Sequence, residues 1–492
     1  MTAAPGVNRY PWTRSAALLA GPVVLLLAVL LGPGSLALPA RLVLGIAGWM
    51  AVWWLTEPVP LAATALIPLA LFSLLGISSA REAASPYASE IVFLFLAGFL
   101  LAAALERWRA HERIAYRMIA LMGVTGNRIV LGMIMATGFI SMWISNTATA
   151  AMMYPIALAV GALFGDNADA RRMRIALMLG IAYAASIGGI GTLIGTPPNL
   201  ILAAAAQQLT GRQIDFVSFM MVGVPIVLVM LPLTWALLVF VLFPNRASLS
   251  GTAADTLGRH RAELGPIRGG EQHTLILFAL TAVAWVFRER KDLGGIVIPG
   301  LTDLAPGITD ASIGMVSVVL LFALTGRDRS GGRRPLLQWD EAKRIPWDVL
   351  LLFGGGLSLA AAMESTGVTA WIAGSLTGLK GYPTVVLYIG LAVVICGLSE
   401  LASNTAVATM AMPLAAALAV AVDQPPLAMM MVASLAASTG FALPVATPPN
   451  AIVFGSGQLS VRDMLKAGLL LDAIAIIVIV AAVALLYPIV FP

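Results

Sequence analysis

The sequence has little charge and few of the side chains that enzymes use. Only 11% of its 492 residues are charged, whereas soluble domains carry about 25%. The single cysteine, Cys396, cannot form an internal disulfide, and there are three histidines in all. No group of His, Cys or carboxylate residues has the spacing of a metal centre or of an activated nucleophile. No repeat resembles a selectivity filter either. We therefore expect neither an enzyme nor a channel.

Apolar residues make up 60% of the chain. The runs 16–32, 217–243 and 467–490 have, or nearly have, the roughly 20 apolar residues that cross a bilayer. A signal peptide is the competing interpretation of 16–32, but no small-residue cleavage pattern follows it and further spans come at once. The sequence predicts an all-α integral membrane protein that crosses the bilayer many times.

Basic residues between the apolar runs indicate orientation. Arg9 and Arg14 precede the first run, and further basic clusters lie in 106–128, 244–271 and 327–346. By the positive-inside rule these segments are cytoplasmic. This predicts a multi-pass protein of the inner (cytoplasmic) membrane with a cytoplasmic N-terminus and an external C-terminus. Eleven transmembrane helices are expected at 16–32, 41–56, 60–76, from about 91, 174–208, 217–243, 272–287, 309–326, from 347, 427–457 and 467–490.

Two further apolar stretches are split by the same polar triplet. Ser145-Asn146-Thr147 interrupts 129–165, which has basic clusters at both ends. Ser403-Asn404-Thr405 interrupts 383–421, whose flanks are poor in basic residues. Each half is at the lower length limit for a span, so we expect two re-entrant hairpins that enter from opposite sides. Two full spans in place of the first hairpin would also satisfy the charge pattern.

The two halves of the chain repeat one another. A shift of 258 residues superposes the following pairs, the last after a shortening of seven residues: LFLAGFLLAAALE (94–106) with LFGGGLSLAAAME (352–364), SNTATAAM (145–152) with SNTAVATM (403–410), and GTPPN (195–199) with ATPPN (446–450). Inverted repeats with interrupted helices are typical of secondary transporters that bind substrate near the midplane.

This repeat predicts a division of the chain into five parts. They are N-terminal scaffold spans (1–90), a first repeat core (91–243) with hairpin 129–165 and broken helix 174–208, a cytoplasmic loop (244–271), connecting spans with a cytoplasmic linker (272–346), and a second repeat core (347–492) with hairpin 383–421 and broken helix 427–457.

Helices broken inside a membrane expose backbone groups that can bind ions. The half-helices that begin after Thr147 and Thr405 would present N–H groups and a positive dipole end to an anion. The preceding half-helices would present carbonyl oxygens to a cation. The Pro-Pro pairs should keep the GTPPN and ATPPN loops out of helix and leave the carbonyls of Gly195 and Ala446 available. None of the four motifs contains Lys or Arg, which favours an anion neutralised partly by a bound cation.

Glu400 is the intramembrane acid closest to a motif, three residues before Ser403. Its carboxylate could hold a proton or a cation, or it could line a solvated cavity. A proton-coupled or antiporting anion carrier with Glu400 as the titrating group is therefore an alternative on the same fold.

At these residues the chain resembles the divalent anion:sodium symporter family, the sodium–dicarboxylate and sodium–sulfate cotransporters. The likeness lies in WWLTEPVPLAATALIPL (53–69), SMWISNTATAAMM (141–153), SIGGIGTLIGTPPN (186–199), PWDVLLLFGGGLSLA (346–360) and GFALPVATPPN (440–450). The resemblance implies a homodimer in which each protomer has a scaffold and an elevator-type transport domain, with Na⁺ as the coupling ion.

The resemblance also implies site residues. Sodium would be held by Ser141, Ser145, Asn146 and Gly195 in the first repeat and by Ser399, Ala402, Asn404 and Ala446 in the second. Substrate would meet Ser145, Asn146, Thr147, Thr196, Pro198, Ser403, Asn404, Thr405, Thr447 and Pro448. The SMWISNTATA context resembles the dicarboxylate branch, which favours symport of succinate, malate or fumarate. A sodium-independent dicarboxylate exchanger and a sodium/sulfate symporter are the alternatives.

Overall fold

The computed structural model describes residues 11–110, 112–114, 117–118, 125–247, 265–267, 269–292, 297–328 and 331–491, and is mostly helical. Most of the predicted cytoplasmic loop 244–271 lies outside these residues. Among the described residues, eight helices are long and apolar enough to cross a membrane. Four shorter apolar segments accompany them, at Leu61–Leu71, Gly126–Ser141, Asp310–Ala323 and Pro426–Ala437.

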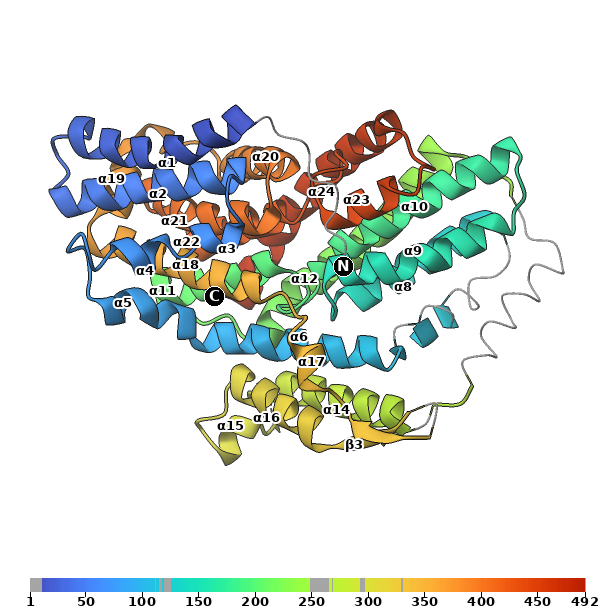
Figure 1. Cartoon of the computed structure of the whole chain (residues 1–492). Helices are drawn as coiled ribbons and strands as arrows, with labels where there is room; N and C mark the ends of the chain where they lie inside the picture. Colours follow the sequence, from blue (N-terminus) through green and yellow to red (C-terminus); the bar gives the residue numbers. More distant parts are fainter. Residues whose placement is uncertain are drawn as a thin grey trace.

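The N-terminal elements form one corner of the molecule, drawn in blue in Figure 1. They are α1 (Pro11–Leu31), α2 (Leu38–Thr56), α3 (Leu61–Thr64), α4 (Ile67–Leu71), α5 (Ala80–Ala84) and the 3₁₀ helix η1 (Ser85–Ala88). Many leucines of α1 are exposed, Leu31 to 77%, as expected for a helix that faces lipid. The predicted span 60–76 is not one helix, because Pro68 lies at the start of α4 and proline breaks the helical hydrogen-bond ladder.

The first repeat supplies α6 (Glu90–Arg107), α8 (Gly126–Ser141), α9 (Asn146–Ala162), α10 (Ala168–Gly189), α11 (Pro197–Thr210) and α12 (Phe216–Ala236), which continues as the π-helix η2 (Leu237–Leu242). The second supplies α18 (Trp347–Ser365), α19 (Val368–Ser375), η3 (Thr377–Leu379), α20 (Thr384–Leu401), α21 (Asn404–Ala421), α22 (Pro426–Ala437), α23 (Pro448–Phe454) and α24 (Val461–Val490). The chain therefore breaks at both triplets, between α8 and α9 and between α20 and α21.

Between the repeats lie α14 (Gly269–Val286), β1 (Lys291–Asp292), β2 (Val297–Ile298), α15 (Leu301–Leu304), α16 (Asp310–Ala323), β3 (Thr325–Arg327), β4 (Arg333–Pro335) and α17 (Trp339–Ala342). The strands form two antiparallel pairs, β1 with β2 and β3 with β4. The predicted span 309–326 ends earlier, at Ala323. The residues that follow pair as β3 with β4, and Gly326 in β3 packs against the backbone of Gly270, where a Cβ would lie 2.2 Å from the Gly270 Cα.

These middle elements form a layer beneath α6 in Figure 1. At one end, the guanidinium of Arg113 pairs with Glu271 at 2.6 Å between Nε and Oε1. The Trp108 indole donates to the Leu336 carbonyl at 2.8 Å. These two contacts join the residues that follow α6 to α14 and to the residues after β4.

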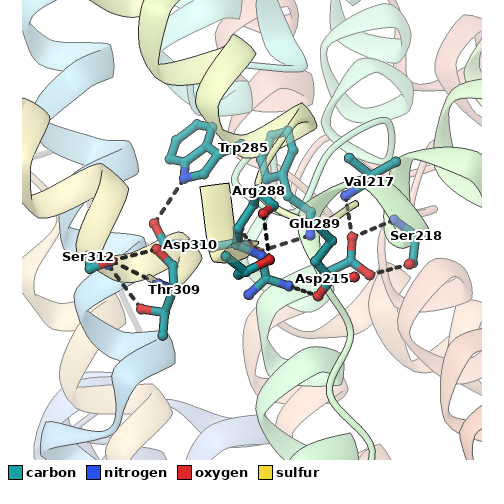
Figure 2. A network of polar contacts seen from close by, with 11 residues as sticks. Asp215, Val217, Ser218, Trp285, Arg288, Glu289, Thr309, Asp310 and Ser312 are labelled. Atoms are coloured by element: carbon teal, nitrogen blue, oxygen red, sulfur yellow. Dashed lines mark hydrogen bonds and ion pairs between the residues drawn. The ribbon is translucent and has the colours of Figure 1, made fainter. Parts of the chain in front are cut away.

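At the other end of the layer, Asp310 joins three helices (Figure 2). Its carboxylate lies 3.1 Å from Nε of Arg288 and accepts from the backbone N–H of Phe216 at the start of α12. The carbonyl of Asp310 accepts from Trp285 near the end of α14. α12, α14 and α16 are therefore fixed to one another by one buried acid.

The second halves of the two broken helices, α11 and α23, each pack against the other repeat. α11 packs against α18, α21 and α22 of the second repeat, and α23 packs against α9 and α10 of the first. In Figure 1, α23 accordingly lies beside α10, at a distance along the molecule from α11. The Ser434 hydroxyl of α22 donates to the Pro198 carbonyl at 2.7 Å. This exchange forms one continuous core from both repeats.

Candidate functional site

The first triplet forms an oxygen cluster with the ends of α8 and α10. Ser141 Oγ lies 2.9 Å from Asn146 Oδ1 and 2.6 Å from the Ala185 carbonyl oxygen, and Ser141 is fully buried. A hydroxyl has one proton to share between these two acceptors. The cluster is therefore rich in oxygen and poor in protons, which is the environment that a hard cation prefers.

The second triplet forms the same cluster. Ser399 Oγ lies 2.8 Å from Asn404 Oδ1 and 2.6 Å from the Ala437 carbonyl oxygen. Ser399 is also fully buried. The distances agree with those of the first repeat to within 0.1 Å (2.9 against 2.8 Å and 2.6 against 2.6 Å). We name the two groups the Ser141–Asn146 cluster and the Ser399–Asn404 cluster.

Each cluster faces the break loop of its own repeat, residues 190–196 or 438–447. Our prediction that the proline pairs lie within the breaks is wrong. Pro197 and Pro448 are the first residues of α11 and α23, where the missing N–H costs nothing because the first turn has no partner for it. The prolines start the second half-helices, and the breaks lie before them.

Glycines allow the first break loop to lie directly on the Ser141–Asn146 cluster. A Cβ on Gly189 would be 2.4 Å from Asn146 Oδ1. A Cβ on Gly195 would be 2.5 Å from the Gly189 carbonyl oxygen and 3.0 Å from that of Met142. Gly195, a predicted sodium ligand, is thus brought to the same place as Asn146. In the second repeat the fit is looser, because a Cβ on Gly440 would lie 3.3 Å from the Ser399 carbonyl.

The break loops are also tied to the ends of α8 and α20, by different bonds in the two repeats. In the first, the Thr192 hydroxyl donates to the Met142 carbonyl. In the second, Glu400, at the position that matches Met142, accepts from the backbone N–H groups of Ala442 and Leu443 at 2.8 and 2.9 Å. Asp472 of α24 accepts from the neighbouring Phe441 N–H at 3.3 Å. In this structure Glu400, whose role the sequence leaves open, therefore holds the second break loop.

Two asparagines outside the predicted site residues also hold the break loops. Asn199 Nδ2 donates to the carbonyls of Gly189 and Thr192 at 2.8 and 2.7 Å. Asn450 Nδ2 donates to the carbonyls of Gly440 and Leu443 at 3.1 and 2.9 Å. Asn199 is the last residue of GTPPN and Asn450 is the last residue of ATPPN. This identical place in the repeat was the signal that could have identified them.

The remaining predicted substrate residues lie at four helix starts. Ser145 and Ser403 are the N-caps of α9 and α21, and Ser145 Oγ accepts from the Ala148 N–H at 3.3 Å. Thr196 and Thr447 are the N-caps of α11 and α23 and are buried. The starts of α9 and α21 can offer backbone N–H groups to anionic oxygens. α11 and α23 each begin with two prolines, which have no N–H, so their contribution there is the threonine hydroxyl.

The other predicted residues differ in exposure. Thr147 is exposed, and Asn404 and Thr405 are half-buried. Ala402 and Ala446 are buried. Pro198 is buried with its carbonyl bonded to Ser434, whereas Pro448 is exposed. The structure thus joins each triplet to its own break loop and places both prolines at helix starts.

The comparisons with known proteins agree with this combination of apolar helices and paired oxygen clusters, which is that of a membrane transporter. A family profile described as the sodium:sulfate symporter transmembrane region matches residues 11–491, so the chain belongs to the divalent anion:sodium symporter family. A sodium-dependent dicarboxylate transporter, SdcS, of Staphylococcus saprophyticus is 39% identical over 479 residues, which cover 96% of this chain and 91% of that protein. SdcS of Staphylococcus aureus is 38% identical over 481 residues, with the same shares.

A solved structure shares the fold. The crystal structure of the Alcanivorax borkumensis YdaH transporter matches 92% of this chain and 99% of its own, with a TM-score of 0.58 and 12% sequence identity. At that identity the likeness concerns the fold alone.

Proposed function

We propose that this protein is a secondary active transporter that couples the inward movement of sodium to that of a C4 dicarboxylate such as succinate, malate or fumarate. The observation that carries the proposal is the duplicated oxygen cluster, Ser141–Asn146 and Ser399–Asn404, each buried beside a break in a helix. The names of the relatives, sodium-dependent dicarboxylate transporters at 38–39% identity, support the choice of ion and substrate.

Two clusters would bind two sodium ions. In the first, the ligands would be Ser141, Ser145, Asn146 and Gly195. In the second they would be Ser399, Ala402, Asn404 and Ala446. These residues offer only neutral oxygen atoms of hydroxyl, amide and carbonyl groups. Such oxygens suit an ion that must be released at the end of each cycle, because a carboxylate in a buried site would bind a cation far more tightly.

The substrate carboxylates would meet the starts of α9, α21, α11 and α23, with Ser145, Asn146, Thr147, Ser403, Asn404, Thr405, Thr196, Thr447, Pro198 and Pro448 around them. A dianion has two charged ends, and the two triplets offer two sets of N–H groups. Because no Lys or Arg lies in the motifs, the anion would gain much of its neutralisation from bound sodium. Sodium binding would therefore raise substrate affinity, which is the linkage that coupled transport requires.

The membrane arrangement follows from the same proposal. The pairs α8–α9 and α20–α21 would be re-entrant hairpins of an inverted repeat that enter from opposite sides, among eleven spans. The N-terminus would be cytoplasmic and the C-terminus external, in the cytoplasmic membrane. The hairpins with the broken helices would form the moving part of an elevator, and α1–α6 with α14–α18 the scaffold of a homodimer.

The boundary between these two parts supports an elevator motion. Trp143, at the tip between α8 and α9, makes an edge contact with Phe278 of α14 at 5.2 Å between ring centroids. Beside it lies a cavity of about 230 Å³ whose lining includes Leu105, Phe139 and Ile144. The boundary is apolar along this stretch, and apolar contacts of this kind can slide past one another at small energetic cost.

Uptake of radiolabelled succinate into proteoliposomes tests the proposal. We expect accumulation above the external concentration when sodium is high outside, none when choline replaces sodium, and little inhibition by excess sulfate. Sodium-independent uptake that requires internal dicarboxylate would instead establish an exchanger. Inhibition by sulfate with equal potency would move the substrate to the sulfate class.

A further inference from the structure

The carboxamides of Asn199 and Asn450 occupy equivalent places in the two repeats. Each lies three residues after the threonine N-cap of a second half-helix and is fully buried. Each donates its two N–H bonds to the residues ten and seven positions earlier, Gly189 and Thr192 or Gly440 and Leu443. The same two bonds form in each repeat although the loop sequences differ, which indicates that both break loops need to be held in the same way.

The orientation of each amide is fixed by these bonds. A flipped amide would direct its oxygen at two carbonyl oxygens, which would repel it. With the amino group on the carbonyls, Oδ1 of both asparagines is buried and has no hydrogen-bond partner within the described residues. An unpartnered buried acceptor is costly. Both repeats keep this arrangement, so fastening the two loop carbonyls outweighs the loss.

Two of the four fastened carbonyls belong to glycines, Gly189 and Gly440, that lie against the oxygen clusters. Gly189 lies against Asn146, with 2.4 Å between its ideal Cβ position and Oδ1, and the Gly189 carbonyl lies against Gly195. Gly440 lies beside the Ser399 carbonyl and the Ala446 side chain. Each asparagine therefore acts on its cluster through the glycine that it holds, Gly189 or Gly440.

We infer that Asn199 and Asn450 are positioning residues for sodium, which hold the break loops at the spacing that each cluster needs to close around the ion. The inference rests on the proposed function. It adds two residues that act through Gly189 and Gly440 and do not themselves touch the ion.

The variants that test this inference are Asn199→Asp and Asn450→Asp, which keep side-chain size. A carboxyl group has no N–H and at most one O–H, so it cannot hold both carbonyls. Asn167→Asp is the matched control. Asn167 caps the other end of α10 by accepting from the Ala170 N–H at 2.8 Å, and a carboxylate caps a helix equally well.

The measurement is the melting temperature of detergent-purified protein against sodium concentration, with choline keeping ionic strength constant. A ligand that binds only the folded state stabilises it by RT ln(1 + [L]/Kd), so the melting temperature begins to rise as the sodium concentration passes the Kd. We expect each variant to need at least about tenfold more sodium than the wild type for the same rise in melting temperature, a loss of about 1.4 kcal/mol in sodium binding. The Asn167→Asp control should match the wild type. The succinate KM at saturating sodium should stay within about twofold, because bound sodium then holds the break loops in place in the variants as well.

Two results would overturn the inference, and they are distinguishable. A lower melting temperature in choline with an unchanged sodium requirement would show that the asparagines only stabilise the fold. If the wild type itself gains no more stability from sodium than from choline, the proposed function fails and this inference falls with it. Where an Asp variant does not fold, Asn199→Ser and Asn450→Ser remove the amide without adding charge and are measured in the same way.

Discussion

Gly189 and Gly440 match in the repeat but should respond differently to the same substitution. In Gly189→Ala the new Cβ would lie 2.4 Å from Asn146 Oδ1 and 3.0 Å from both Asn146 Nδ2 and Thr196 Cβ. Asn146 would have to leave its contact with Ser141. In Gly440→Ala the nearest atoms are 3.3 and 3.4 Å away, which small shifts can accommodate.

The size of the effect follows from the overlap. Forcing an extra methyl group into a packed site costs about 1–3 kcal/mol. If this free-energy cost weakens sodium binding, the sodium concentration for half-maximal uptake rises by about 5- to 150-fold. Gly440→Ala should change it by less than about threefold, since overlap of that size costs under about 0.6 kcal/mol.

Sodium-activation curves of succinate uptake in proteoliposomes provide the assay, with melting temperature in choline as the control for folding. Ala favours helix over Gly by up to about 1 kcal/mol, so Gly189→Ala at the end of α10 should remain folded. Equal sodium activation in Gly189→Ala and the wild type would refute the place that we assign to Asn146.

Two further substitutions test the supports around the site. Glu400→Gln replaces one carboxylate oxygen by an amino group that faces a backbone N–H, so stability should fall by about 1–3 kcal/mol, seen as a lower melting temperature. The pH profile of uptake should be unchanged, and loss of pH dependence would favour the proton-coupled alternative. Asp310→Asn breaks the buried pair with Arg288 (Figure 2) and should cost about 2 kcal/mol of stability while sodium activation stays as in the wild type. A shift in sodium activation would show that this network reaches the clusters.

The repeat in the sequence was sufficient to locate both breaks at the triplets, whereas the grouping of Ser141 with Asn146 and of Ser399 with Asn404 came from the family resemblance. Matching segments at a fixed offset are visible in one sequence, and they identify positions that both halves need. Helix boundaries were also predicted well for α12 with η2 and at the end of α24, whereas α24 begins at Val461, before the predicted 467, because its first turn is polar.

Long-range partners could not be predicted in this way. Glu400 bonds to backbone groups 42 and 43 residues away, and backbone groups have no residue type by which to find them. Asn199 and Asn450 were overlooked because the adjacent prolines suggested a break, although proline also begins helices. The span expected at 60–76 failed because hydropathy does not register the proline that divides it.

The most direct test of the account is the sodium dependence of uptake in Asn146→Ala and Asn404→Ala, with Asn167→Ala as a control for a capping asparagine outside the clusters. Each cluster would lose its amide oxygen, so both variants should need at least about tenfold more sodium, whereas Asn167→Ala should affect stability alone, by about 1 kcal/mol. Wild-type sodium activation in both Asn146→Ala and Asn404→Ala would contradict the assignment of the two clusters as sodium sites.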